Sequence, residues 1–263
     1  YRSFYSYDHT DLKATVEAVD DTPPDWRREK VTFGAAYDNQ RVVAYLFLPR
    51  NSIPPYQTVV YYPCAAGLAS TSSDDLELMV VEFLIRSGRA VLYPVYYGMY
   101  ERNSEPSAGG PAFVRDRVIR WAKDFGRSVD YLETRPDIDR DRLAFYGLSL
   151  GAVEGPVLTA IDGRMKAIIL HGGGLPQYRR LAEVDPIHFA PLVRAPVLMI
   201  GGRLDSIQRV ETCQKPLLRF LGAPGKDKRI LIVDRGHSVY PTPPVINESL
   251  AWLGRYLGPV KTR

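Results

Sequence analysis

A serine between two glycines carries the most specific chemical signal in this chain. The stretch 145–152 reads FYGLSLGA, with Ser149 at its centre and Gly147 and Gly151 on either side. A serine hydroxyl is a weak nucleophile unless a base removes its proton and the backbone holds it exposed. A strained turn between a strand and a helix can expose the serine hydroxyl in this way, and the residues next to the serine in such a turn must have small side chains. The helix that follows would direct N–H groups at the reacting oxygen. The pattern therefore predicts nucleophilic catalysis by Ser149.

The serine needs a base and an acid, and the ends of two later strands supply them. Residues 196–200 form an apolar run that Asp205 follows, and residues 228–233 form another that His237 follows. Carboxyl ends of parallel strands meet at one edge of a sheet, so we expect these side chains to lie near Ser149. His237 would take the serine proton, and Asp205 would fix the imidazole. The order Ser, Asp, His along the chain is that of the nucleophile-elbow hydrolases.

Other residues compete for these roles less well. Asp234 ends its own strand, three residues before His237, and fits a turn or cap better. His9 precedes the predicted sheet, and His188 lies in a connecting segment. The stretch His171–Gly174 reads HGGG, like the oxyanion loop of lipases. An oxyanion loop follows a strand that precedes the nucleophile, whereas this stretch follows the strand that comes after the nucleophile's helix. We interpret it as a glycine loop near the mouth of the site.

Strands that alternate with amphipathic helices must position these residues. The predicted strands are 29–33, 41–48, 57–62, 89–93, 142–146, 166–170, 196–200 and 228–233. The predicted helices include residues 76–84, 114–132, 150–161, 210–220 (begun or kinked at Pro216) and 246–257. Short connections between them are typical of an α/β fold with a doubly wound, mostly parallel sheet and helices on both faces. Gly155-Pro156 interrupts one predicted helix without an explanation in the sequence. We expect one domain over residues 1–263, with residues 1–26 left unassigned.

Bulk composition narrows the function further. The chain has 263 residues, 45% hydrophobic and 24% charged, which is ordinary for a globular protein. Its net charge of +4 comes without a dense Lys/Arg block, so we expect no nucleic-acid partner. No apolar run is long enough to span a membrane. Two cysteines make no disulfide framework, which slightly favours the cytoplasm, and four dispersed histidines predict no metal site. Because the chain starts at Tyr1, a fused or upstream domain is compatible with it, and the oligomeric state is open.

These motifs together resemble α/β-hydrolases of the dienelactone hydrolase and acetyl xylan esterase type. The chain is also similar to hydrolase domains appended to some bacterial serine/threonine protein kinases. The resemblance covers roughly residues 31–257 and rests on Gly147–Gly151, the Asp205 loop and Gly236-His237. It implies an α/β-hydrolase fold and a serine esterase that needs no cofactor, and the segment 175–194 is too short for a large cap domain.

The resemblance also implies an oxyanion hole. The backbone N–H after the nucleophile, that of Leu150, is one expected donor, and the loop after residues 57–62 supplies the other. Where relatives have His-Gly-x, this chain has Pro63-Cys64-Ala65. We expect Ala65 to be the second donor, with Cys64 as the alternative.

Loops around the site suggest the substrate. Residues 175–194 hold only about a short helix, so we expect an open pocket that suits a small acyl group on a bulky alcohol. Tyr96, Tyr97 and Tyr100 lie in a loop after a strand, either as surface aromatics or as an aromatic wall that binds substrate.

The sequence thus predicts hydrolysis of short-chain esters, such as an acetyl group on a carbohydrate, or of aromatic acyl esters. A prolyl oligopeptidase-type peptidase is a weaker alternative, because no segment of the size of a propeller domain is present. A non-catalytic binding or regulatory module on a hydrolase fold, serving a fused kinase, is the alternative of another class.

Overall fold

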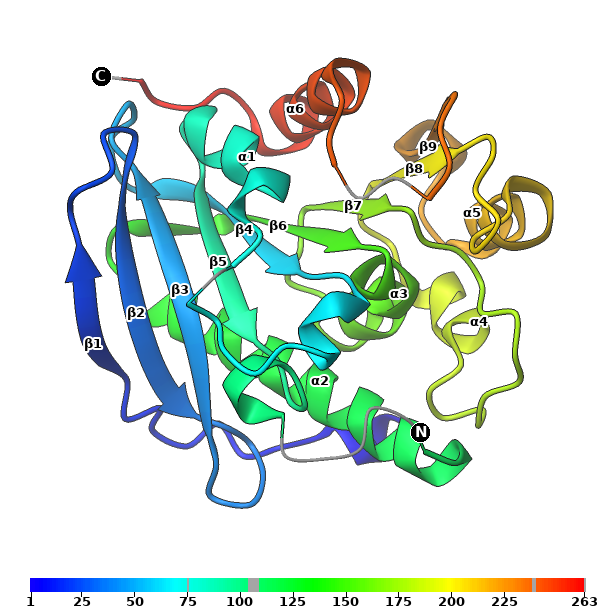
Figure 1. Cartoon of the computed structure of the whole chain (residues 1–263), viewed down its shortest axis with the longest axis horizontal. Helices are drawn as coiled ribbons and strands as arrows, with labels where there is room; N and C mark the ends of the chain where they lie inside the picture. The colour runs from blue at the N-terminus through cyan, green and yellow to red at the C-terminus, as the bar shows by residue number, and fades with distance from the viewer. Residues whose placement is uncertain (75, 104–108, 238–239, 263) are drawn as a thin grey trace.

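The strands of the protein join in one twisted sheet (Figure 1). The computed structural model describes residues 1–74, 76–103, 109–237 and 240–262. Within these ranges the sheet has nine strands in the order β1-β2-β3-β5-β4-β6-β7-β8-β9. Their bounds are β1 Thr15–Asp20, β2 Trp26–Gly34, β3 Arg41–Pro49, β4 Tyr56–Tyr62, β5 Ala90–Val95, β6 Ile138–Leu148, β7 Ala167–His171, β8 Val197–Gly202 and β9 Lys228–Val233. The pairs from β1 to β5 are antiparallel, and those from β5 through β4 to β9 are parallel. This confirms the predicted doubly wound, mostly parallel sheet.

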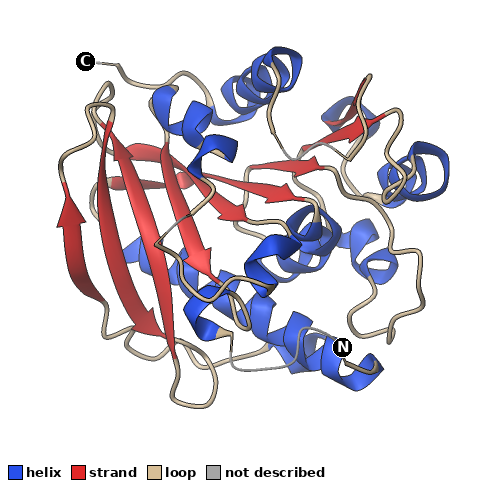
Figure 2. Cartoon of the chain, in the orientation of Figure 1, coloured by secondary structure: helices blue, strands red, loops and turns tan. Residues whose placement is uncertain are grey.

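Helices cover both faces of this sheet. Their bounds are α1 Glu82–Arg86, α2 Pro111–Thr134, α3 Leu150–Asp162, α4 Pro186–Phe189, α5 Lys215–Phe220 and α6 Pro243–Leu257. Figures 1 and 2 show α1 and α6 on one face and α2 and α3 on the other. No helix in the described ranges is both long and apolar enough to cross a membrane.

Burial explains why the central strands read as continuous apolar runs. All residues of β5 and β7 are buried, as are those of β4 after Tyr56. Parallel strands covered by helices on both faces favour apolar side chains at most positions. On α2, the predicted stripe faces this core, with Trp121, Phe125 and Val129 almost fully buried. Helices therefore cover both faces of these parallel strands, and the loops after β4, β6, β8 and β9 all leave the sheet at the same edge.

One unassigned stretch forms a strand, one predicted helix is partly wrong, and the predicted irregularity of another helix is confirmed. Residues 15–20, which the sequence left unassigned, form the edge strand β1, whose apolar residues Val16 and Val19 are exposed. The predicted helix over 76–84 is wrong in its first part: only the 3₁₀ turn Leu78–Val80 and α1 are helical, and Met79 is 60% exposed. The helix over 210–220 begins as a π-helical turn and becomes α-helical at Lys215, so the predicted change near Pro216 is confirmed.

The Gly155-Pro156 interruption lies inside α3 and has a packing reason. A Cβ at Gly155 would lie 2.6 Å from Cδ2 of Leu170 and 2.9 Å from the Phe145 ring. Glycine therefore lets α3 approach β6 and β7 closely, which fixes the helix that carries Ser149 at its start.

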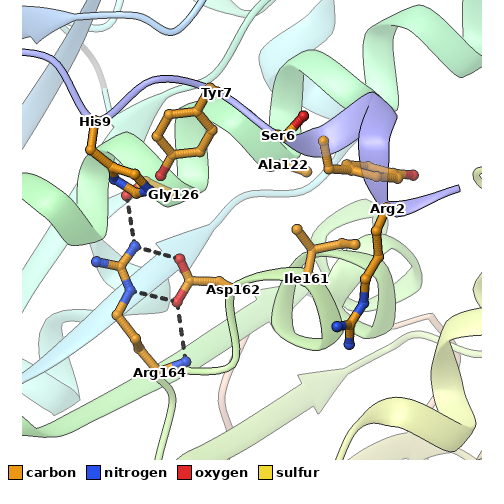
Figure 3. Close-up of a pocket in the computed structure, with 10 residues that line it drawn as sticks. Arg2, Ser6, Tyr7, His9, Ala122, Gly126, Ile161, Asp162 and Arg164 are labelled. Atoms are coloured by element: carbon orange, nitrogen blue, oxygen red, sulfur yellow. Dashed lines mark hydrogen bonds and ion pairs between the residues drawn. The ribbon is translucent and has the colours of Figure 1, made fainter.

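The N-terminal segment packs against α2 and α3 and is an integral part of the fold. The Tyr7 hydroxyl donates to Asp130 on α2 at 3.1 Å, and Tyr5 is buried. Between this segment and the two helices lies a cavity of about 460 Å³. Figure 3 shows its walls, with the Asp162–Arg164 ion pair opposite Tyr7. Residues of the predicted catalytic set do not line this cavity.

Candidate active site

Ser149 lies at the sharp turn between β6 and α3, as predicted. Its φ of +50° and ψ of −104° are rare for a residue with a side chain. Its backbone N–H donates to the carbonyl oxygen of His171 at 2.8 Å, which ties the turn to the end of β7. This turn separates the serine side chain from the regular structure on either side of it.

The two flanking glycines are required by close backbone contacts. A Cβ at Gly147 would overlap the carbonyl group of Gly151. A Cβ at Gly151 would overlap the carbonyl oxygen of Tyr62, at the end of β4. Backbone atoms cannot yield as a flexible side chain can, so the prediction that these neighbours must lack bulk is confirmed.

The structure brings the three predicted catalytic side chains together. The Ser149 Oγ lies 2.8 Å from Nε2 of His237, and Nδ1 of His237 lies 2.8 Å from Oδ2 of Asp205. The Asp205 side chain is 1% exposed and that of His237 17% exposed, so the acid is enclosed and the base is accessible. An ionised carboxylate only accepts hydrogen bonds, which places a proton on Nδ1 and leaves the lone pair of Nε2 toward the serine.

Backbone groups fix the carboxylate of Asp205. Its second oxygen, Oδ1, accepts the N–H groups of Ile207 at 2.9 Å and Gln208 at 2.7 Å. By contrast Asp234, the rival acid, is exposed and pairs with Arg203. The preference for Asp205 over Asp234 therefore agrees with the geometry.

The two expected oxyanion donors stand at the starts of helical turns. Leu150 begins α3, and Ala65 begins the 3₁₀ turn Ala65–Leu68 after β4. The N–H of Gly151 donates to Pro63 O at 3.2 Å, which holds this loop against α3. In the described part of the chain, no backbone acceptor binds the N–H of Leu150 or Ala65, as expected for the first residues of a helix. Their role as donors stays a prediction.

Cys64 precedes Ala65 and has the character of a packing residue. Burial raises the pKa of its thiol, which keeps the sulfur protonated. Its Sγ lies 3.8 Å from a carboxylate oxygen of Glu77. These surroundings oppose a reactive thiolate.

The predicted roles of Tyr96, Tyr97 and Tyr100 are corrected by their burial. They are 0%, 3% and 5% exposed, so they are neither surface aromatics nor an open wall at the mouth of the site. The Tyr96 ring stacks on Tyr62 with centroids 4.0 Å apart, and the Tyr100 hydroxyl lies 2.8 Å from that of Tyr93. The chain turns inward directly after β5, so these rings complete the core.

The His171–Gly174 stretch abuts the site without supplying the base. His171 is buried with Nδ1 2.9 Å from the Tyr146 hydroxyl. Burial, with a smaller effect of nearby His237, lowers its pKa to about 4, so it is neutral at pH 7. A Cβ at Gly172, whose φ is +70°, would lie 3.5 Å from Cε1 of His237. The interpretation of this stretch as a glycine loop near the site is confirmed.

Sequence reasoning missed a buried ion pair on the helix that follows the nucleophile. Nη1 of Arg180 lies 2.8 Å from the Glu154 carboxylate, and the two side chains are 2% and 0% exposed. Glu154 lies on α3, five residues after Ser149. A glutamate within the apolar stretch 150–161 was the available signal, because a buried carboxylate needs a partner. Within the described ranges, no group of three His, Cys, Asp or Glu side chains is arranged to hold a metal ion.

Solved structures share this architecture. An acetyl xylan esterase from Paenibacillus sp. R4 superimposes with a TM-score of 0.71 at 20% identity, over 94% of this chain and 90% of that one. Acetyl xylan esterase 1 from Thermoanaerobacterium sp. JW/SL YS485 gives 0.71 at 15% identity, over 97% and 91%. A Klebsiella pneumoniae protein assigned as a dienelactone hydrolase gives 0.65 at 18%, over 91% and 100%. No family model matches the chain, and no curated protein matches it in sequence. At these identities the likeness concerns the fold: the chain has the α/β-hydrolase fold.

Proposed function

We propose that the protein is a serine hydrolase that cleaves carboxylic esters through an acyl-enzyme on Ser149. The observation that carries the proposal is the continuous hydrogen-bonded line from Ser149 through His237 to Asp205, with 2.8 Å at each step. It stands at the carboxyl edge of a parallel sheet, where such folds bind ligands.

The reaction follows from the positions of these atoms. The Ser149 Oγ attacks the ester carbonyl carbon while Nε2 of His237 takes its proton. The carbonyl oxygen becomes an oxyanion, which the N–H groups of Leu150 and Ala65 stabilise. Each such donor is worth about 3–4 kcal/mol in the transition state. The carbon–oxygen bond to the alcohol then breaks, and His237 returns the proton to the departing alcohol.

Water completes the cycle. The oxygen of a water molecule attacks the acyl carbon while His237 takes a proton from this water. The bond between the acyl carbon and Ser149 Oγ then breaks, the acid leaves, and His237 returns the proton to Ser149. Asp205 stabilises the imidazolium in both halves of the reaction. This scheme needs no cofactor.

The proposed substrate class is a short-chain acyl ester, with acetyl first. The segment between β7 and β8 is short and contains only α4 and one 3₁₀ turn, Ala190–Leu192. In the part of the chain that the structure describes, no large cap domain therefore encloses a long acyl chain. The acetyl xylan esterases among the similar structures also favour an acetyl group on a carbohydrate. Burial of Tyr96, Tyr97 and Tyr100 withdraws the argument for aromatic acyl esters.

Hydrolysis of p-nitrophenyl esters, from acetate to long chains, tests the proposal. We expect activity that is highest at acetate or butyrate and is lost in Ser149→Ala. Ser3→Ala, at an exposed serine of the N-terminal segment, is the matched control and should keep full activity. Equal activity in wild type and Ser149→Ala would refute the mechanism, and higher activity on long chains would refute the substrate class. Absence of activity in both would favour the regulatory-module alternative.

A further inference from the structure

The segment of residues 175–185 lies between β7 and α4, and it contacts both the loop that carries the acid and the helix that follows the nucleophile. At its start, Leu175 N–H donates to Cys213 O at 3.1 Å, and the Gln177 amide donates to Ile207 O. Ile207 N–H in turn donates to Asp205. The first part of the segment is therefore attached to the loop that carries the acid.

The middle of the same segment is anchored to the nucleophile's helix. Arg180 makes the buried pair with Glu154 of α3. Farther along, Glu183 O accepts the Tyr5 hydroxyl at 2.6 Å, and Val184 is fully buried. Contacts at both ends and in the middle therefore hold this segment in place.

One aromatic side chain on this fixed segment faces solvent. Tyr178 is 60% exposed, although its hydroxyl accepts Nη2 of Arg180 at 2.8 Å and its ring centroid lies 5.1 Å from that guanidinium. Ile207, on the adjoining loop, is 54% exposed. An exposed apolar side chain alone is ordinary. Here Arg180, which the buried pair with Glu154 holds in place, fixes the orientation of the exposed ring. Such a ring is preorganised to stack on a flat face of a ligand.

The geometry points to Tyr178 as a specificity-determining residue that stacks on a ring in the alcohol part of the ester. This inference rests on the proposed function. His237 gives its proton to the leaving alcohol, so the alcohol must lie next to Nε2 of His237. The segment that carries Tyr178 is hydrogen-bonded to Ile207 in the Asp205 loop, and Asp205 holds the same imidazole through Nδ1. The matching ligand is an alcohol with a flat or ring-shaped apolar face, either an aryl ring or a sugar ring.

Two acetate esters with alcohols of similar acidity separate ring binding from chemistry. Benzyl acetate carries a ring in its alcohol, and ethyl acetate does not. We expect Tyr178→Ala to lower kcat/KM for benzyl acetate about five- to tenfold, mainly by raising KM. This fold-change corresponds to the loss of one pair of stacked rings, about 1–1.5 kcal/mol. Hydrolysis of ethyl acetate should not change. An acetylated methyl pyranoside, as a third substrate, shows whether a sugar ring benefits equally.

Two variants control for structural damage. Tyr178→Phe keeps the ring but loses the Arg180 hydrogen bond, and should retain most of the benzyl preference. Tyr1→Ala removes a tyrosine that is 63% exposed in the N-terminal segment, and should change neither substrate. A parallel fall on both esters in Tyr178→Ala, or no change on either, would overturn the inference.

A binding measurement keeps this test separate from that of the proposed function. Calorimetric titration of Ser149→Ala with benzyl acetate measures ring binding without turnover. We expect binding that weakens five- to tenfold in Ser149→Ala/Tyr178→Ala. A wild-type protein without esterase activity, with this difference in binding intact, would contradict the hydrolase proposal and leave the ring site standing. Equal binding by the single and double variants would overturn the ring site.

Discussion

Replacing Asp205 with asparagine should be more damaging than its small change in shape implies. The reason is the environment of Oδ1, which accepts two backbone N–H groups, from Ile207 and Gln208. An asparagine whose NH₂ group occupied this position would leave both donors unsatisfied. Each buried orphan N–H costs about 1–3 kcal/mol, so this orientation is disfavoured by about 2–6 kcal/mol. The amide oxygen must therefore take the place of Oδ1.

That orientation turns the NH₂ group of the asparagine toward His237. Nδ1 of His237 must then act as an acceptor, and the ring proton moves to Nε2, which faces Ser149 at 2.8 Å. In this tautomer the imidazole cannot take the serine proton. We expect kcat to fall about 10³- to 10⁴-fold, which corresponds to about 4–5.5 kcal/mol in the activation free energy. Asp205→Ala supplies no competing donor and should retain more kcat than Asp205→Asn.

Initial rates with p-nitrophenyl acetate and thermal unfolding of the same samples test this prediction. Asp234→Asn is the matched control, because Asp234 is exposed and lies three residues before His237. It should keep the wild-type kcat. An Asp205→Asn protein that is folded and keeps more than a tenth of kcat would refute the reasoning about the tautomer.

Three further predictions concern stability. Gly151→Ala should lower the free energy of unfolding in urea by about 1–3 kcal/mol, because the added Cβ would overlap backbone atoms. A Cβ at Gly254 of α6 has no atom within 4 Å, so Gly254→Ala should raise the free energy of unfolding by about 1 kcal/mol. Equal effects of these two substitutions would contradict the packing argument. Burial lowers the pKa of His171 from 6.5 to about 4, so the unfolded chain binds the proton first as pH falls. The free energy of unfolding should therefore fall by about 3 kcal/mol between pH 6.5 and 4. In urea titrations over this pH range, His171→Gln should make the free energy of unfolding depend less on pH. An unchanged pH dependence would contradict the lowered pKa of His171. Glu154→Gln leaves the buried Arg180 charge unpaired and should cost about 3–5 kcal/mol, and adding Arg180→Met should recover part of the loss. A double variant no more stable than Glu154→Gln would count against a buried, unpaired charge as the cause.

Most of the fold could be predicted because its signals are local. The central strands, such as β5 and β7, are apolar runs that are buried at every position, and the long helix α2 carries a regular apolar stripe. Strand β1 could not be predicted, because its short sequence, TVEAVD, does not alternate regularly and none of its residues is buried. The start of the predicted helix over 76–84 is wrong because Met79 supplies apolar periodicity without being buried.

The candidate site divides in the same way. Ser149, Asp205 and His237 could be placed because each follows a strand whose end the topology fixes. The tyrosines after β5 could not, because the sequence does not show whether a loop turns toward solvent or toward the core. Arg180 was missed because its partner on α3 lies 26 residues away in the chain, and only the fold brings the two charges together. The resemblance to kinase-appended hydrolase domains stays a prediction.

Covalent labelling with a fluorophosphonate tests the central claim most directly. The probe reacts with a serine only where a base and an oxyanion site activate it. Intact-protein mass spectrometry should show one adduct on the folded wild type, peptide mapping should place it on Ser149, and Ser149→Ala should show none. A folded wild-type protein that stays unlabelled, or carries the adduct on another residue, would contradict the account.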